Sequence, residues 1–137
     1  MSIRLNIALL MMVTFTLSAF DTYTEAFSAG RSAEQQKRFA EAVDCYRKAE
    51  ALAGNRHEKY NSVFRRAETF RQEKKWDEAR KALHEILQIN GIAPPQRGTA
   101  LIYVGHYFNW EGKPDEALKI FGAVAENRKV HVNNRID

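Results

Sequence analysis

One segment occurs three times in this chain of 137 residues, and it limits the fold more than any other feature. It reads FAEAVDCYRKAEAL from Phe39, WDEARKALHEIL from Trp76 and PDEALKIFGAVAE from Pro114. In each copy an acidic residue precedes an alanine, and large apolar residues follow that alanine at helical spacing. Such a stripe predicts an amphipathic helix. Intervals of 37 and 38 residues separate the shared alanines, Ala42, Ala79 and Ala117.

Another apolar stripe, weakest in the first copy, precedes each of these helices and predicts a second helix in every copy. It covers residues 60–70 and 101–108 in the later copies and residues 26–33 in the first. A small residue stands twelve positions before each shared alanine, namely Gly30, Ala67 or Gly105. We expect these small residues to face one another and to let two helix backbones approach closely.

The helices therefore group into three pairs, at about residues 22–53, 57–90 and 95–128, with a polar C-terminal tail over residues 129–137. Gly54 and Gly91 are well placed to end helices, and Pro94-Pro95 is expected to separate the second pair from the third. A helix pair cannot bury its apolar stripe alone, so the pairs are expected to stack on one another.

This pattern resembles the tetratricopeptide repeat family over residues 22–128. The third copy carries the most specific match, in its apolar, glycine, aromatic and alanine positions: Leu101, Gly105, Phe108, Gly112, Ala117 and Phe121. The resemblance implies an all-α fold, a right-handed α-solenoid of about three antiparallel helix-turn-helix repeats. Because the family repeats at 34 residues, it also implies longer loops between repeats, around residues 54–57 and 91–96.

The first twenty residues differ from the rest of the chain. Arg4 is followed by an uncharged, largely apolar run from Leu5 to Phe20, with small residues at Ser18-Ala19. This pattern predicts a secretory signal peptide over residues 1–19 and an exported, periplasmic or secreted protein. Sixteen helical residues span about 24 Å, less than a bilayer core of about 30 Å. A retained membrane anchor over residues 5–20 is the alternative.

The sequence gives little support for catalysis, a metal or a cofactor. His84-Glu85 begins a zinc-protease-like motif, but Gln88 stands where the second histidine belongs, so no metal site is predicted. No phosphate-binding glycine loop or nucleophile elbow is present. Positive and negative residues alternate along the chain, so no nucleic-acid partner is expected despite a net charge of +4. Cys45 is read as a small, partly buried packing residue rather than a reactive thiol.

The family resemblance implies instead a protein-protein interaction module, an adaptor or scaffold whose concave groove is lined by the first helix of each repeat. The groove floor is expected to consist of the side chains that point away from the helix-packing stripe. They are Thr24, Phe27, Arg31, Asn61, Phe64, Glu68, Arg71, Thr99, Ile102, His106, Asn109 and Trp110.

Within this set, apolar anchoring is assigned to Phe64, Ile102 and Trp110. Hydrogen bonding to an extended peptide backbone or to a carboxylate is assigned to Asn61, Arg71 and Asn109. Trp110 is the leading candidate, and its alternative interpretation is a structural tryptophan half-buried against the Gly112 turn. The family's clamp for a chaperone carboxyl terminus is not expected, because Phe27, Arg65 and Tyr103 stand at matching positions.

A second interpretation is a homo-oligomerising subunit of an envelope assembly. No helix is expected to cap the third repeat, because the residues that follow it are few and polar. Ile120, Phe121 and Val124 would then be covered by the tail or by another molecule, a second copy included. Exposure of a few apolar atoms to solvent is the third alternative.

Overall fold

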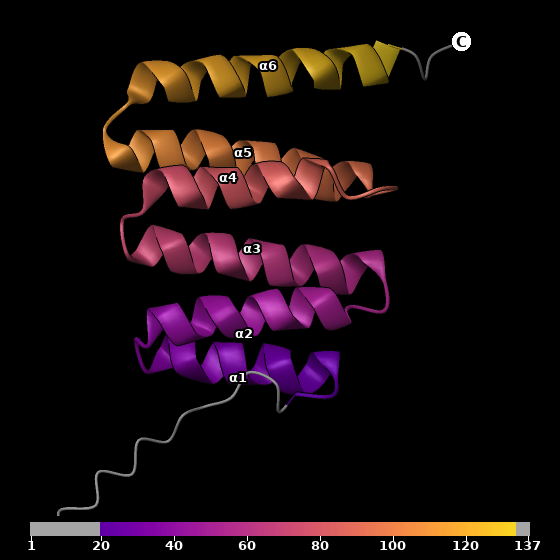
Figure 1. Ribbon diagram of the computed structural model, residues 1–137. Helices are drawn as coiled ribbons and strands as arrows, with labels where there is room; N and C mark the ends of the chain where they lie inside the picture. The colour runs from indigo at the N-terminus through magenta and orange to yellow at the C-terminus, as the bar shows by residue number, and fades with distance from the viewer. Residues whose placement is uncertain (1–19, 134–137) are drawn as a thin grey trace, which may run out of the picture.

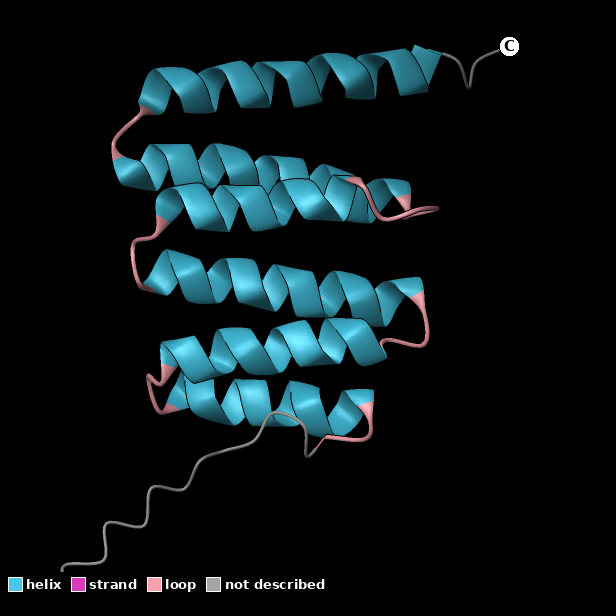
Figure 2. Cartoon of the chain, in the orientation of Figure 1, coloured by secondary structure: helices cyan, strands magenta, loops and turns pink. Residues whose placement is uncertain are grey.

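The computed structural model describes the backbone of residues 20–133 and the side chains of residues 20–128. Within this range the chain forms six α-helices joined by short turns and loops (Figures 1 and 2). They are α1 (Tyr23–Gln35), α2 (Phe39–Leu52), α3 (Arg56–Gln72), α4 (Trp76–Leu87), α5 (Pro94–Glu111) and α6 (Pro114–Asn133). The predicted all-helical repeat fold is confirmed. The predicted signal peptide, residues 1–19, and residues 134–137 lie outside the described range.

The helices stack in chain order, from α1 at one end to α6 at the other (Figure 1). Each helix packs against the next, and in addition α1 touches α3 and α3 touches α5. Among the described helices, α2 and α4 do not meet, and neither do α4 and α6. The first helices of the three pairs are therefore closer together than the second helices. We call the side formed by α1, α3 and α5 the first-helix face.

The core follows the predicted stripes. The shared alanines Ala42, Ala79 and Ala117 are all buried. Gly30 and Gly105 each lie against an aromatic ring of the second helix in their own pair, so the small residue makes room for a ring.

Each pair turns from its first helix to its second through the same backbone geometry. Lys37, Lys74 and Gly112 occupy the left-handed region, with φ of 58°, 59° and 89°. The amide of the next residue donates to the carbonyl five positions earlier, as in Lys75 N to Phe70 O at 2.9 Å. These are Schellman-type helix ends, and glycine occupies the strained position in the third repeat alone.

The loops between pairs differ in length. Three residues, 53–55, join α2 to α3, whereas six residues, 88–93, join α4 to α5. Ile89 and Ile92 of the longer loop are buried in the core, which the sequence analysis did not predict. Gly91 was expected to end α4, but that helix ends four residues earlier, at Leu87. Pro94-Pro95 does not separate two helices either, because it forms the first turn of α5, where proline is favoured.

Two buried arginines connect successive helices. Arg66 of α3 pairs with Glu50 of α2 at 3.1 Å and also with Glu85 of α4. Arg80 of α4 pairs with Glu111 of α5 at 2.5 Å. These ion pairs join α2 to α3, α3 to α4 and α4 to α5. Cys45, predicted to be partly buried, is fully buried, and burial raises the pKa of its thiol.

The C-terminal end differs from its prediction. Residues 129–133 were assigned to a tail, but α6 continues through them to Asn133. No glycine or proline follows Gly122 to interrupt this helix. Phe121 is half-buried against α5, and Ile120 packs on the core. None of the described helices is long and apolar enough to cross a bilayer.

Candidate functional site

Aromatic rings cross the first-helix face from α3 to α5. Tyr60 stacks on Phe64 with 5.7 Å between ring centroids, and Phe64 meets the edge of Tyr103 at 4.8 Å. On α5 the rings recur at positions 103, 106, 107 and 110, a spacing that places them on one side of a helix. We call this set the aromatic row; it consists of Tyr60, Phe64, Tyr103, His106, Tyr107 and Trp110.

Trp110 ends the aromatic row and is its most exposed member, with half of its surface accessible. His106 stacks on its ring at 5.5 Å with an interplanar angle of 18°. The guanidinium of Arg71, from α3, lies 5.4 Å from the ring centroid, close enough for a cation-π interaction. Contacts with His106 and Arg71 therefore restrict the orientation of Trp110, while half of its surface stays open to solvent.

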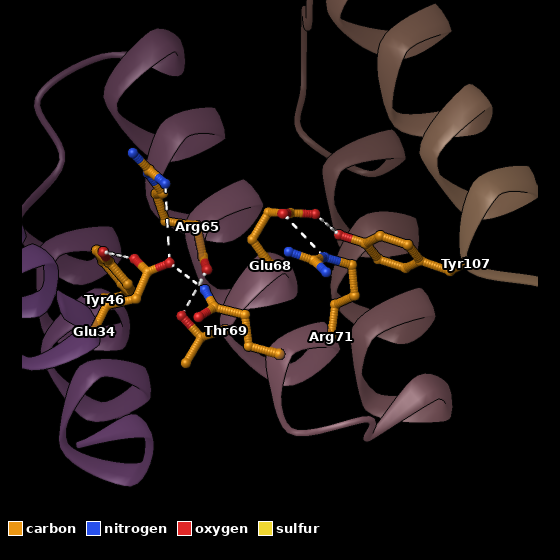
Figure 3. A network of polar contacts seen from close by, with 8 residues as sticks. Glu34, Tyr46, Arg65, Glu68, Thr69, Arg71 and Tyr107 are labelled. Carbon is orange, nitrogen blue, oxygen red and sulfur yellow. Dashed lines mark hydrogen bonds and ion pairs between the residues drawn. The ribbon is translucent and has the colours of Figure 1, made fainter. Parts of the chain in front are cut away.

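A polar group of Glu68, Arg71 and Tyr107 joins the aromatic row to α3 (Figure 3). The Tyr107 hydroxyl donates a hydrogen bond to Glu68, and Arg71 Nε donates to the same carboxylate at 3.1 Å. Tyr107 is fully buried, and burial together with the bond to Glu68 raises the pKa of its hydroxyl far above the ordinary value. Tyr107 thus stays protonated and holds the Glu68 carboxylate in place. Glu68 in turn orients the Arg71 guanidinium against the ring of Trp110.

On the other side of α3, a second polar group surrounds Glu34 of α1 (Figure 3). Its carboxylate accepts hydrogen bonds from the Tyr46 hydroxyl at 2.7 Å and from Gln72 Nε2 at 2.5 Å, and lies 3.9 Å from Arg65. Burial raises the pKa of Tyr46, as does its bond to Glu34. Beside this group lies a pocket of about 320 Å³ between α1 and α3, lined by Arg31, Glu34, Gln35, Lys37, Arg65 and Gln72.

Residues 62–90 match the family model of the tetratricopeptide repeat. The matched segment runs from within α3 to the loop after α4, so it covers most of the second helix pair. A repeat of this family indicates a protein-protein interaction module, and such modules are generally not catalytic. A comparison with curated proteins found no match.

The tetratricopeptide-like stack brings five of the predicted groove residues into one connected group. They are Phe64, Glu68, Arg71, His106 and Trp110. Within this group, Phe64 also packs on the core, so it is less of a free anchor than the sequence suggested.

The remaining predicted residues lie apart from that group. Phe27 packs on Tyr46 at 5.6 Å and covers the core of the first pair. Arg31 lies in the pocket between α1 and α3. Asn61 lies beside the Tyr23 hydroxyl, and Ile102 is half-buried. Asn109 is exposed near the end of α5, and Thr24 and Thr99 flank the face at the starts of their helices.

Sequence reasoning missed the residues that hold the site together. Tyr107 and Glu34 were not singled out, and Arg65 and Tyr103 were considered only as mismatches to a clamp. The spacing of Tyr103, Tyr107 and Trp110 is a signal that would have identified the aromatic row. No comparable signal exists for Glu34, because its partners lie 12 and 38 residues away in the chain.

No metal centre is evident in the part of the chain whose side chains are described, where no three His, Cys, Asp or Glu residues are grouped closely enough to hold an ion. His84 Nδ1 lies 2.8 Å from the Arg80 carbonyl of its own helix, and His57 lies beside Gln96. His131 is outside the described side chains. His57 and His84 therefore have structural neighbours and do not converge on a common point.

Proposed function

We propose that this protein is an exported interaction module that binds a peptide or a protein surface on its first-helix face, with Trp110 as the central anchor. The observation that carries the proposal is the state of Trp110: half-exposed, yet fixed by His106 and Arg71. Rigid, partly exposed tryptophan and arginine side chains are the ones most often found to dominate binding energy in interfaces.

Binding would cost little conformational entropy at this position. Immobilising a flexible side chain on binding costs about 0.5–1.5 kcal/mol, and His106 and Arg71 already restrict Trp110 in the free protein. Glu68 and Arg71 are likewise oriented beforehand by Tyr107. A partner would therefore meet a preformed surface of one open aromatic ring with polar groups at its edge.

The test is crosslinking of the tagged chain in cells, followed by quantitative mass spectrometry, for wild type, Trp110→Ala and Leu118→Ala. Leu118 is a matched control, because it is an exposed apolar side chain on a second helix. We expect a partner near one to one whose recovery falls at least tenfold with Trp110→Ala and stays unchanged with Leu118→Ala. Equal recovery from all three would reject the first-helix face as the binding surface.

A second candidate function, self-association, is favoured by α6. This helix touches α5 alone among the described helices, and its Leu118 is 67% exposed. The surface differs from the one predicted from sequence, since Ile120 and Phe121 face α5 rather than solvent. Light scattering over a range of protein concentrations tests it: a dimer that Leu118→Glu dissociates supports self-association, and a constant monomer mass rejects it.

Export is part of the proposal and rests on the charged and apolar pattern of residues 1–19. Cleavage after Ala19 would leave the start of α1 intact, because its capping box begins at Thr22 with reciprocal bonds to Glu25. N-terminal sequencing of the protein recovered from the cell envelope is the test. A chain that begins at Phe20 supports a removed signal, whereas an intact N-terminus in the membrane fraction supports the anchor.

A further inference from the structure

We infer that the segment bound on the first-helix face carries an acidic side chain and a large apolar side chain about three to four residues apart. The acidic side chain would enter the pocket between α1 and α3, and the apolar one would lie on Trp110. This inference rests on the proposed function and adds the chemistry of the partner to it.

The charge of the pocket selects an anion. Arg31, Lys37 and Arg65 contribute three positive charges, against the single carboxylate of Glu34. That carboxylate is already engaged by Tyr46, Gln72 and Arg65. The side chains of Arg31 and Lys37 are exposed and form no hydrogen bond or ion pair with the described residues.

Arginine geometry favours a carboxylate in this pocket. The Arg65 side chain is 40% exposed, and its 3.9 Å separation from Glu34 is longer than a hydrogen bond. Most of its N–H donors are therefore available to a ligand. A guanidinium binds a carboxylate through two parallel hydrogen bonds, which gives direction as well as charge. The amides of Gln35 and Gln72 at the pocket wall supply further polar surface. An aspartate or glutamate side chain fits this combination of groups.

The surface on the other side of α3, around Trp110, favours an apolar side chain. Arg71 and Glu68 pair with each other at 3.1 Å, so their charges offset one another. What remains open there is the half-exposed ring of Trp110. An apolar side chain would gain contact area on that ring and would leave no charge without a partner.

The distance between the two sites follows from the stack. Helix α3 lies between them, with Arg65 and Glu34 on one side and Arg71 and Tyr107 on the other (Figure 3). An α-helix with its side chains is about 10–12 Å across. An extended chain advances about 3.3–3.6 Å per residue. A segment that crosses α3 therefore reaches the second site about three to four residues after the first.

The experiment is selection from a displayed library of random twelve-residue segments fused at both ends, using the purified full chain. We expect enrichment of segments with Asp or Glu about three to four positions from a large apolar residue. Arg31→Glu should abolish the acidic preference, and Trp110→Ala the apolar one. The matched control is Arg47→Glu, a charge reversal at an exposed residue of α2, which should change neither.

Binding of a selected segment, synthesised as a peptide, should weaken at least tenfold with Arg31→Glu and less than twofold with Arg47→Glu. Enriched segments that depend on Trp110 but show no acidic preference would overturn the inference and leave the proposed function standing. If the wild-type protein enriches no segments beyond those that Trp110→Ala enriches, both the inference and the proposed function would be overturned. Amidated and free-acid peptides should bind alike; binding of the free acid alone would assign the pocket to a chain terminus and overturn the inference.

Discussion

The ring of Phe121 packs directly on the Cα of Gly105, sixteen residues earlier in the chain. A Cβ atom at Gly105 would lie 2.5 Å from Phe121 Cε1, far inside contact distance. Gly30 and Tyr46 have the same offset and the same relationship, with 2.7 Å from a Cβ to Tyr46 Cε1. Glycine is therefore required wherever the second helix of a pair presents an aromatic ring at this position.

The second pair solves the same packing problem with different residues. Ala67 and Leu83 stand at the equivalent positions, again sixteen apart, and both are fully buried in one core cluster. Alanine is larger than glycine by one methyl group, and leucine is smaller than an aromatic residue. The two positions thus compensate each other in volume across the three repeats, as close packing of a core demands.

Replacing Gly105 with alanine should lower the free energy of unfolding by about 1–3 kcal/mol, because the new methyl group overlaps the ring of Phe121. Urea unfolding followed by circular dichroism measures this. Gly98→Ala is the control in the same helix, since a Cβ there meets nothing within 4 Å. It should raise stability by about 0.5–1 kcal/mol. Equal effects of the two substitutions would contradict the packing argument.

Lys74→Gly should stabilise the protein by about 0.5–1 kcal/mol. Its φ of 59° is strained for a residue with a side chain, at a cost of about 1–2 kcal/mol, part of which the flexibility of glycine in the unfolded chain offsets. Gly112→Ala, at the matching turn, should lower stability by a similar amount. Thermal melts of both variants report the difference, and a destabilised Lys74→Gly variant would show that the lysine has another role.

Stability at alkaline pH should depend on Tyr107. Burial and the bond to Glu68 raise the pKa of its hydroxyl in the folded state, whereas a tyrosine in the unfolded chain has a pKa of about 10. The stabilisation is therefore complete below about pH 10 and decreases as the pH rises above that value.

Urea unfolding of wild type and Tyr107→Phe at pH 8, 10 and 11 tests this dependence. At pH 8 the variant should be less stable by about 1 kcal/mol, because Glu68 loses one donor and keeps Arg71. The difference should shrink at pH 11, and a constant difference would count against the assigned pKa direction. Tyr46 should behave in the same way, since its pKa is raised for the same reasons.

Arg66→Ala should cost about 1–3 kcal/mol, less than a fully buried pair would. Its side chain is 7% exposed, but those of Glu50 and Glu85 are 24% and 42% exposed, so water partly replaces the lost partner. Arg66→Met, which preserves the packing of the aliphatic stem, should cost less than Arg66→Ala. Chemical denaturation of both variants checks the order, and equal losses would assign the whole effect to charge.

Much of the fold was predictable from local pattern. Positions three and four residues apart lie on one side of a helix whatever surrounds it, so the stripes through Ala42, Ala79 and Ala117 predicted the second helices correctly. The interval between repeats predicted the stack for a similar reason, because a single pair cannot bury its own stripe. The strained turns at Lys37 and Lys74 were not predicted, since lysine carries no signal for that conformation.

The sequence by itself determined six helices, their pairing and the side of each first helix on which Trp110 and Arg31 lie. Only the tertiary structure decided which side chains meet across helices. Tyr107 and Glu68 are 39 residues apart, and Gln72 and Glu34 are 38 apart. Helical periodicity fixes the direction of a side chain from its own helix, whereas its partner on another helix depends on how the two helices pack.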